Sequence, residues 1–184
     1  GKTVLRILNT LRGQLNMPAM EFSEISKALS LGGKNLIELA LGPSVNSLEY
    51  LERFRSVYLN DSLAGEELYP GLLEYLQALK SGNVKIAICS NKPSQLVNKV
   101  LAHHKIGHYF GYVVADSGLF PKKPSPEGLM QILSWAKLSP KKTILIGDSR
   151  IDQLAASSAG IKFAFHQAGY DDGVLADNTY IRFK

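Results

Sequence analysis

Cysteine is nearly absent from this sequence: Cys89 is the only one among 184 residues. One cysteine cannot form an intrachain disulfide, and by itself it cannot supply a cysteine-based zinc site. Such sparing use favours a reducing compartment, so we expect a cytoplasmic protein. Long apolar runs are also missing, because no run approaches the ~18 residues that span a bilayer, and no signal-peptide pattern is present. We therefore expect no membrane partner.

The charge balance is mildly basic, with 21 lysines and arginines against 16 aspartates and glutamates. The basic residues are scattered and form no stripe with interleaved aromatic residues, so we expect no nucleic-acid partner. The hydrophobic share of 45% and the charged share of 20% are typical of a globular protein. The length fits one core domain with a modest insertion.

The first third of the chain has the patterns of helices and no convincing strand. Apolar residues recur at helical spacing within 4–15, and Ser23 is expected to cap a short helix with Glu24 in its first turn. Two further helices are expected at about 34–41 and 48–58. We interpret residues 1–66 as an α-helical domain.

From about residue 69 onward, helical and strand patterns alternate. Short apolar runs predict strands at 84–89, 112–115, 143–146, 161–165 and 179–183. Helical spacing predicts helices at 72–79, 96–101, 129–136 and 153–159. Such alternation is typical of an α/β fold in which a parallel sheet is flanked by helices, and we assign it to residues 67–184.

Polar residues follow two of the predicted strands. Ser90 and Asn91 come directly after strand 84–89, before a helix expected to start at Pro93, where a hydroxyl and free N–H groups form a natural phosphate cradle. The plainer alternative is a helix cap. Lys123 follows strand 112–115 on a loop just before Pro124, where it can neutralise a phosphate or oxyanion, or simply lie at the surface.

Two carboxylates follow the strand at 143–146. Asp148 and Asp152 are four residues apart at the entrance of a helix, and therefore face the same way. Hard oxygen ligands of this kind suit Mg²⁺, which binds one or two carboxylates together with substrate phosphate. The alternative is that these aspartates only complement the helix dipole.

Taken together, these segments resemble the haloacid dehalogenase-like superfamily, and in particular its phosphoglycolate phosphatase-like members. The resemblance rests on Ser90-Asn91-Lys92-Pro93, on Lys123-Pro124-Ser125-Pro126 and on Gly147-Asp148-Ser149-Arg150-Ile151-Asp152. It implies a Rossmann-like core with a small α-helical cap, and a phosphatase that uses Mg²⁺ on a small phosphorylated metabolite. It also implies roles for individual residues.

Those roles follow the motifs position by position. The resemblance implies that Ser90 and Asn91 bind the phosphoryl group, that Lys123 holds the phosphate and the charge of the nucleophile, and that Asp148 and Asp152 form or support the metal site. Lys34, in the predicted cap, would close over the substrate.

One departure from the family pattern concerns the nucleophile. The family's first motif, Asp-x-Asp-x-Thr, ends its first strand; its first Asp forms the aspartyl phosphate and its second is the general acid and base. No aspartate occurs here before Asp61. We expect that the nucleophile lies upstream, in about 10 to 25 further residues, and that this chain alone is inactive. The family's first strand lies between the strands expected at 84–89 and 143–146, so these two should be a strand's width apart.

Several alternatives stay open at this stage. An inactive phospho-ligand-binding protein, a phosphomutase and a pyrophosphatase share the same motifs, and the protein could be a monomer or a homodimer. A haloacid dehalogenase shares the fold but needs no metal, so the acidic pair argues against that function. Gly1-Lys2-Thr3 resembles the end of a P-loop without its preceding strand, and Cys89 lacks the arginine that a cysteine phosphatase needs six residues later, where Gln95 stands.

Overall fold

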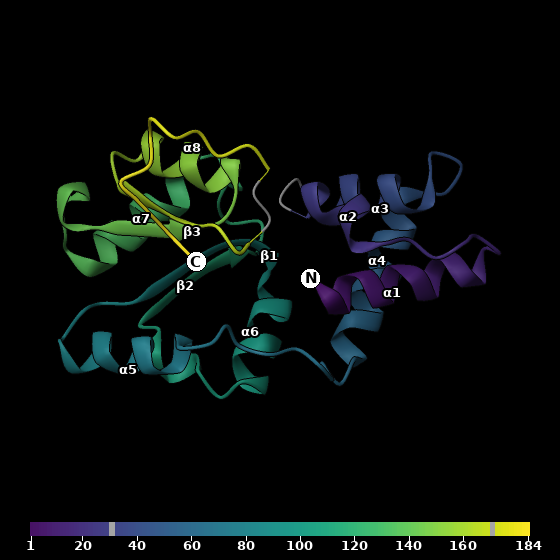
Figure 1. Ribbon diagram of the computed structural model, residues 1–184, viewed down its shortest axis with the longest axis horizontal. Helices are drawn as coiled ribbons and strands as arrows, with labels where there is room; N and C mark the ends of the chain where they lie inside the picture. The colour runs from purple at the N-terminus through teal and green to yellow at the C-terminus, as the bar shows by residue number, and fades with distance from the viewer. Residues whose placement is uncertain (30–31, 170–171) are drawn as a thin grey trace. The chain divides into compact units, whose positions relative to one another are not determined.

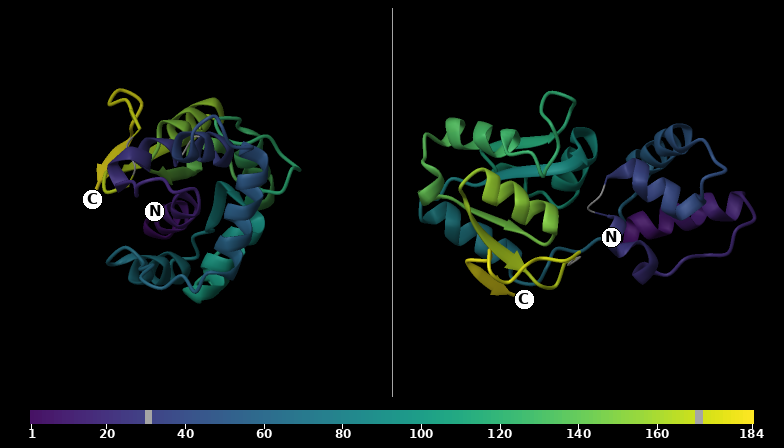
Figure 2. Two further views of the ribbon diagram at one scale, coloured as in Figure 1. Left: turned by 90° about the vertical axis from the view of Figure 1, so that its right-hand side faces the viewer. Right: turned by 90° about the horizontal axis from the view of Figure 1, so that it is seen from above.

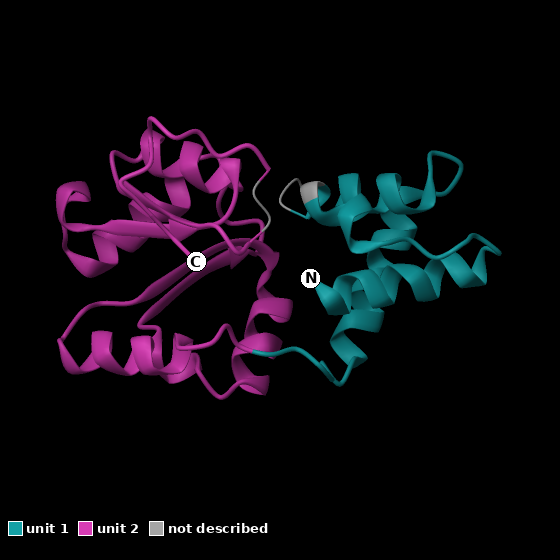
Figure 3. Cartoon of the chain, viewed as in Figure 1, with its two compact units in different colours: residues 1–67 teal, residues 68–184 magenta. Residues whose placement is uncertain are grey.

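The computed structural model describes residues 1–29, 32–169 and 172–184. The chain forms two compact units, Gly1–Glu67 and Leu68–Lys184, coloured separately in Figure 3. Each unit is described by itself. In the described residues, no helix is both long and apolar enough to cross a membrane.

The first unit is helical throughout its described part (Figure 1). Its elements are α1 (Lys2–Gln14), α2 (Phe22–Ile25), the 3-10 turn η1 (Ser26–Ala28), α3 (Gly33–Leu41) and α4 (Ser47–Asn60). The apolar face of α1 is buried at Ile7, Leu8 and Leu11, as its periodicity predicts. An ion pair from Arg6 to Asp61, at 2.7 Å, ties α1 to the residue that ends α4.

One local prediction for this unit is wrong in detail. Ser23 lies inside α2, because Glu21 is the N-cap and forms a reciprocal capping box with Glu24. Lys34 lies in the first turn of α3, in agreement with the helix expected at about 34–41, and its ammonium lies 3.6 Å from the carboxylate of Glu38.

The second unit has parallel strands and surrounding helices (Figures 1 and 2), so the predicted α/β class is confirmed. Its strands are β1 (Ala87–Pro93), β2 (Tyr112–Asp116), β3 (Ile144–Gly147), β4 (Lys162–His166) and β5 (Ile181–Phe183). Its helices are α5 (Leu72–Ser81), α6 (Ser94–His103), α7 (Glu127–Ala136) and α8 (Arg150–Ser158), with 3-10 turns η2 (Gly107–Tyr109) and η3 (Pro140–Lys142).

The largest boundary error concerns β1, which starts three residues later than predicted and extends to Pro93. Its pairing with β2 is irregular between Cys89 and Pro93, so Ser90 and Asn91 lie in the irregular end of the strand and not in a free loop. Helix α6 then starts at Ser94 with Pro93 as its N-cap. This extension of the strand was not predicted, because the residues after the apolar segment are polar.

The strands form two separate parallel sheets, β1–β2 and β3–β4–β5. In the part of the chain that the structure describes, β1 pairs only with β2, and β3 pairs only with β4. On β3 the isoleucines Ile144 and Ile146 remain 51% and 47% exposed. The strands predicted to be a strand's width apart are therefore not paired directly, as expected.

The core of the second unit lies between α7, α8 and β4. It contains Leu129, Leu133, Ala155, Ala156, Ala159, Ile161, Phe163 and Phe165. The three alanines allow α8 to approach the sheet closely, because they carry only a methyl group. This packing fixes the start of α8 beside the end of β3, where the acidic pair lies.

Candidate active site

Lys123 is the centre of the polar network at the carboxyl ends of the strands. Its ammonium donates to the carbonyl oxygen of Cys89 at 2.7 Å and to Asp152 Oδ1 at 2.6 Å. Only 12% of the Lys123 side chain and 10% of the Asp152 side chain are exposed. Lys123 thus connects the end of β1 with the start of α8.

Asn91 holds the backbone of Lys123 from both sides. The Lys123 N–H donates to Asn91 Oδ1 at 2.7 Å, and Asn91 Nδ2 donates to the Lys123 carbonyl at 2.8 Å. The peptide bond between Lys123 and Pro124 is cis. The two hydrogen bonds hold the Lys123 backbone against Asn91. They therefore fix the point from which the lysine side chain extends into the site.

Asp152 is held as firmly as its lysine partner. Its Oδ2 accepts a hydrogen bond from Ser149 Oγ at 2.7 Å, and the same Oγ accepts from the Asp152 N–H at 3.2 Å as the N-cap of α8. A Cβ on Gly147 would lie 2.7 Å from Asp152 Oδ2, so glycine leaves the room that this carboxylate needs. Both oxygens of Asp152 therefore have partners inside the protein.

Asp148 directly follows the end of β3 and packs against the loop after β4. A Cβ on Gly169 would lie 2.2 Å from Asp148 Oδ2, so the carboxylate lies against bare backbone there. Burial raises the pKa of Tyr69, and the negative charge of Asp148 raises that pKa further. The Tyr69 ring meets His166 edge to face, with centroids 4.5 Å apart. No role for Tyr69 was predicted from the sequence.

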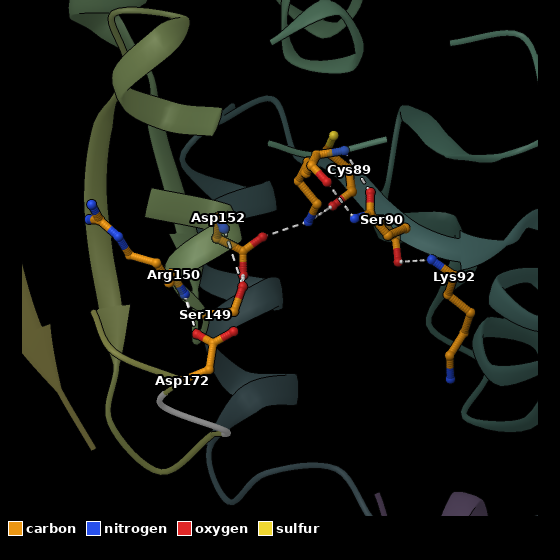
Figure 4. Close-up of polar contacts among 9 residues, drawn as sticks. Cys89, Ser90, Lys92, Ser149, Arg150, Asp152 and Asp172 are labelled. Atoms are coloured by element: carbon orange, nitrogen blue, oxygen red, sulfur yellow. Dashed lines mark hydrogen bonds and ion pairs between the residues drawn. The ribbon is translucent and has the colours of Figure 1, made fainter. Parts of the chain in front are cut away.

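Ser90 lies at the end of β1, where its Oγ accepts from the Lys92 N–H at 3.1 Å. In this arrangement the hydroxyl hydrogen can still donate to a ligand. Figure 4 shows Ser90 and Lys92 on one side of the site, with Ser149, Asp152 and Asp172 on the other. Ser90 thus faces the site from β1, while the acidic residues come from β3, α8 and the C-terminal segment.

A further set of hydrogen bonds supports the site, and the sequence did not predict it. Gln153 is 1% exposed, and its amide donates to the Leu175 carbonyl at 2.7 Å and accepts from the Leu175 N–H at 2.9 Å. The Arg150 N–H donates to Asp172 Oδ1. These bonds fix the segment after β4 against the start of α8. The sequence feature that could have indicated this role is a polar glutamine on the inner face of the predicted helix.

The carboxylates at this site match a divalent cation only in part. In the described residues, no group of three or more His, Cys, Asp or Glu side chains could hold a metal ion. Asp148 offers the hard oxygen donors that Mg²⁺ prefers, and Mg²⁺ needs only one or two protein carboxylates. Since Asp152 is engaged by Lys123 and Ser149, it fits a supporting role better than a direct one.

Cys89 does not match the nucleophile of a cysteine phosphatase. Burial raises the pKa of its thiol; the nearby Lys123 ammonium opposes this shift and the Asp152 carboxylate adds to it. A thiol with a raised pKa stays protonated at neutral pH, whereas a nucleophilic cysteine is a thiolate. The sequence already lacked the required arginine.

Comparison with known proteins identifies the class to which this fold and site belong. The model of the haloacid dehalogenase-like hydrolases matches residues 1–166, and the chain belongs to this family. Phosphoglycolate phosphatase 1 of Pseudomonas aeruginosa is 29% identical over 173 residues, which cover 90% of this chain and 64% of that protein. Phosphoglycolate phosphatase of Pseudomonas fluorescens is 35% identical over 150 residues, covering 77% and 55%. This chain thus spans less than two thirds of the length of these two relatives.

Solved structures show the same fold. A crystal structure of a predicted phosphoglycolate phosphatase from Haemophilus somnus superimposes with a TM-score of 0.87 at 24% identity, covering 98% of this chain and 86% of that one. The structure of CbbY from Rhodobacter sphaeroides in complex with phosphate superimposes with a TM-score of 0.79 at 17% identity, covering 99% and 86%. The predicted membership of the phosphoglycolate phosphatase-like group is therefore confirmed.

Proposed function

We propose that this chain forms the phosphate-binding and metal-binding part of a Mg²⁺-dependent phosphatase for a small, phosphoglycolate-like phosphate monoester. The observation that carries the proposal is the Lys123 ammonium, held between the Cys89 carbonyl and Asp152 with little exposure. A lysine fixed in this way can stabilise the negative charge of a transferring phosphoryl group without reorganising first. The names of the relatives support the substrate class.

Each site residue then has a defined task. Lys123 neutralises phosphate charge, Ser90 donates its hydroxyl hydrogen to a phosphate oxygen, and Asn91 fixes the lysine backbone. Asp152 orients the ammonium through the 2.6 Å contact. A Mg²⁺ ion held by Asp148 would add positive charge at the phosphate.

The nucleophile comes from outside these 184 residues in this proposal. A strand paired between β1 and β3 would place an aspartate beside Lys123, and the separation of the two sheets supports such a strand. That aspartate would attack phosphorus while the ester oxygen leaves with a proton from a second aspartate, and water would then hydrolyse the aspartyl phosphate.

A phosphatase assay on the chain completed with an Asp-x-Asp segment tests the proposal. We expect hydrolysis of phosphoglycolate that requires Mg²⁺ and that Asp148→Ala abolishes. The matched control is Asp177→Ala, which removes an exposed aspartate and should leave the rate unchanged. Full turnover in excess chelator, or in the Asp148→Ala variant, would contradict the metal role.

A second candidate is an inactive protein that binds a phosphorylated ligand. Ser90 and the Lys123 ammonium would bind a phosphoryl group whether or not a nucleophile is present, and this function needs no more than that. Binding of phosphoglycolate without any turnover by the completed chain would select this function over the phosphatase.

A further inference from the structure

Acidic residues are distributed unevenly along the chain, although the lysines and arginines are scattered. No aspartate or glutamate occurs between Glu74 and Asp116. The same stretch holds Lys80, Lys85, Lys92, Lys99, Lys105, His103, His104 and His108. It forms most of α5, all of β1 and α6, the turn η2 and most of β2, so one part of the second unit carries basic groups without acidic residues among them.

A shallow groove lies within this basic part, between α6 and the edge strand β2. It is lined by Asn98, Leu101 and Ala102 of α6, by Lys105 in the turn after that helix, by Gly107 and His108 of η2, and by Val113 of β2. No carboxylate lines the groove, and no described acidic residue pairs with Lys105. The groove therefore combines an apolar floor with cationic and polar groups at its side and end.

The strand beside the groove has a free edge. In the described residues β2 pairs only with β1, which leaves its other edge without a strand partner. Val113 is 37% exposed, and the segment Tyr112–Asp116 has no lysine or proline of the kind that usually protects edge strands. An extended peptide can pair with such an edge and place alternate side chains into the neighbouring groove.

We propose that the groove between α6 and β2 binds an extended acidic polypeptide segment, which adds to the free edge of β2. The strand edge supplies backbone hydrogen bonds, Leu101 and Val113 contact apolar side chains, and Lys105 attracts carboxylates. A second copy of this chain fits less well, because pairing β2 with β2 would bring two basic grooves together and like charges repel. A nucleic acid would leave the strand edge unused.

Fluorescence anisotropy with a labelled peptide tests this inference independently of phosphatase activity. The probe is a ten-residue peptide of alternating glutamate and valine, added to the intact protein. Two matched peptides serve as controls: one with lysine in place of glutamate, and one with alternate backbone nitrogens methylated to prevent strand pairing. We expect binding of the first peptide only.

Matched variants of the protein locate the site. We expect Lys105→Glu to weaken binding of the acidic peptide about tenfold, because it replaces an attractive charge with a repulsive one. Lys141→Glu makes the same change at an exposed lysine in η3 and should alter binding less than about twofold, since exposed distant charges are screened by salt. Phosphatase activity of the chain completed with the Asp-x-Asp segment should stay unchanged by both substitutions.

Four outcomes would overturn the inference. The first is absence of binding by the acidic peptide, and the second is equal affinity of the two lysine variants. The third is equal binding of the methylated peptide or of single-stranded DNA, which would show a general polyanion surface without strand pairing. The fourth is self-association of the intact protein that blocks the peptide, which would assign the groove to a second copy.

Discussion

At the scale of single residues, Lys123 and Asp152 form a pair in which each charged group has two hydrogen-bond partners inside the protein. The ammonium has two oxygen partners, and the carboxylate has Lys123 on one oxygen and Ser149 on the other. Charged groups with so little exposure need such partners, because an unpaired buried charge is costly. The pair therefore fixes the position of the ammonium and also contributes to the stability of the fold.

Removing one partner should cost more than removing both. We expect Lys123→Met to lower the free energy of unfolding by about 3 kcal/mol, because it leaves Asp152 buried without its cation. The double variant with Asp152→Leu should be more stable than the sum of the two single changes predicts. Urea unfolding of the four proteins measures this coupling, and strict additivity of the two changes would show that the pair is not coupled.

The thiol of Cys89 gives a pH-dependent test of the same site. Because its pKa is raised by burial, its reaction with a thiol reagent should reach half its maximum above the usual value of about 8.5. Lys123→Met removes the cation that opposes the shift, so it should move this midpoint to still higher pH. Lys122→Met, which removes the exposed partner of Asp116, is the matched control.

The sign of the linked stability change follows from the raised pKa. The contribution of Cys89 to stability is fully present below the pKa of the unfolded thiol, and it is lost as the pH rises through the raised pKa of the folded thiol. Cys89 is the only cysteine, so both the reaction rate and its pH midpoint report on one group. A midpoint at or below about 8.5 would show that burial is not the dominant influence on the pKa of Cys89.

At the scale of elements, glycine decides how closely β3 approaches α8. A Cβ on Gly147 would lie 2.7 Å from three atoms of Asp152, so Gly147→Ala should displace that carboxylate and destabilise the protein by about 1 to 3 kcal/mol. Gly13→Ala in α1 meets no atom within 4 Å and should stabilise it by roughly 0.5 kcal/mol. Thermal unfolding of both variants measures this difference in stability. Equal effects of the two substitutions would contradict the prediction.

The elements themselves were largely predictable, whereas their polar ends were not. Helical spacing predicted α1, α3, α4 and α5 to within a few residues, since each buries one apolar face. The strand β1 was misplaced because its last residues are polar and pair irregularly with β2. The start of α8 was missed because Ser149 and Asp152 cap it through side-chain bonds that no apolar pattern records.

The strand ends at which the candidate site residues lie were predictable, but the hydrogen bonds among these residues were not. Parallel strands bring their carboxyl ends to one edge, which is why Ser90, Lys123 and Asp148 could be selected from the sequence. The direct contact from Lys123 to Asp152 could not be predicted, because it depends on the path of a loop between β2 and α7. The role of Gln153 as an anchor for the C-terminal segment was likewise hidden.

At the scale of the whole chain, the proposed additional strand would account for the divided sheet and would also carry the proposed nucleophile. Adjacent strands lie about 4.8 Å apart, so one strand between β1 and β3 would pair both of their open edges. The same strand would cover Ile144 and Ile146, which are about half exposed. It would also end beside Lys123, where the family's first motif carries its aspartates. Supplying this strand should therefore restore both stability and chemistry.

The most direct test is the rate of phosphoglycolate hydrolysis by two proteins measured side by side: the 184-residue chain alone, and the same chain with a strand segment ending in Asp-x-Asp. The account predicts no turnover by the chain alone, and Mg²⁺-dependent turnover by the completed protein that is lost when the first aspartate of the added segment becomes asparagine. A comparable rate from the 184-residue chain alone would contradict the account, because a residue already present would then be the nucleophile.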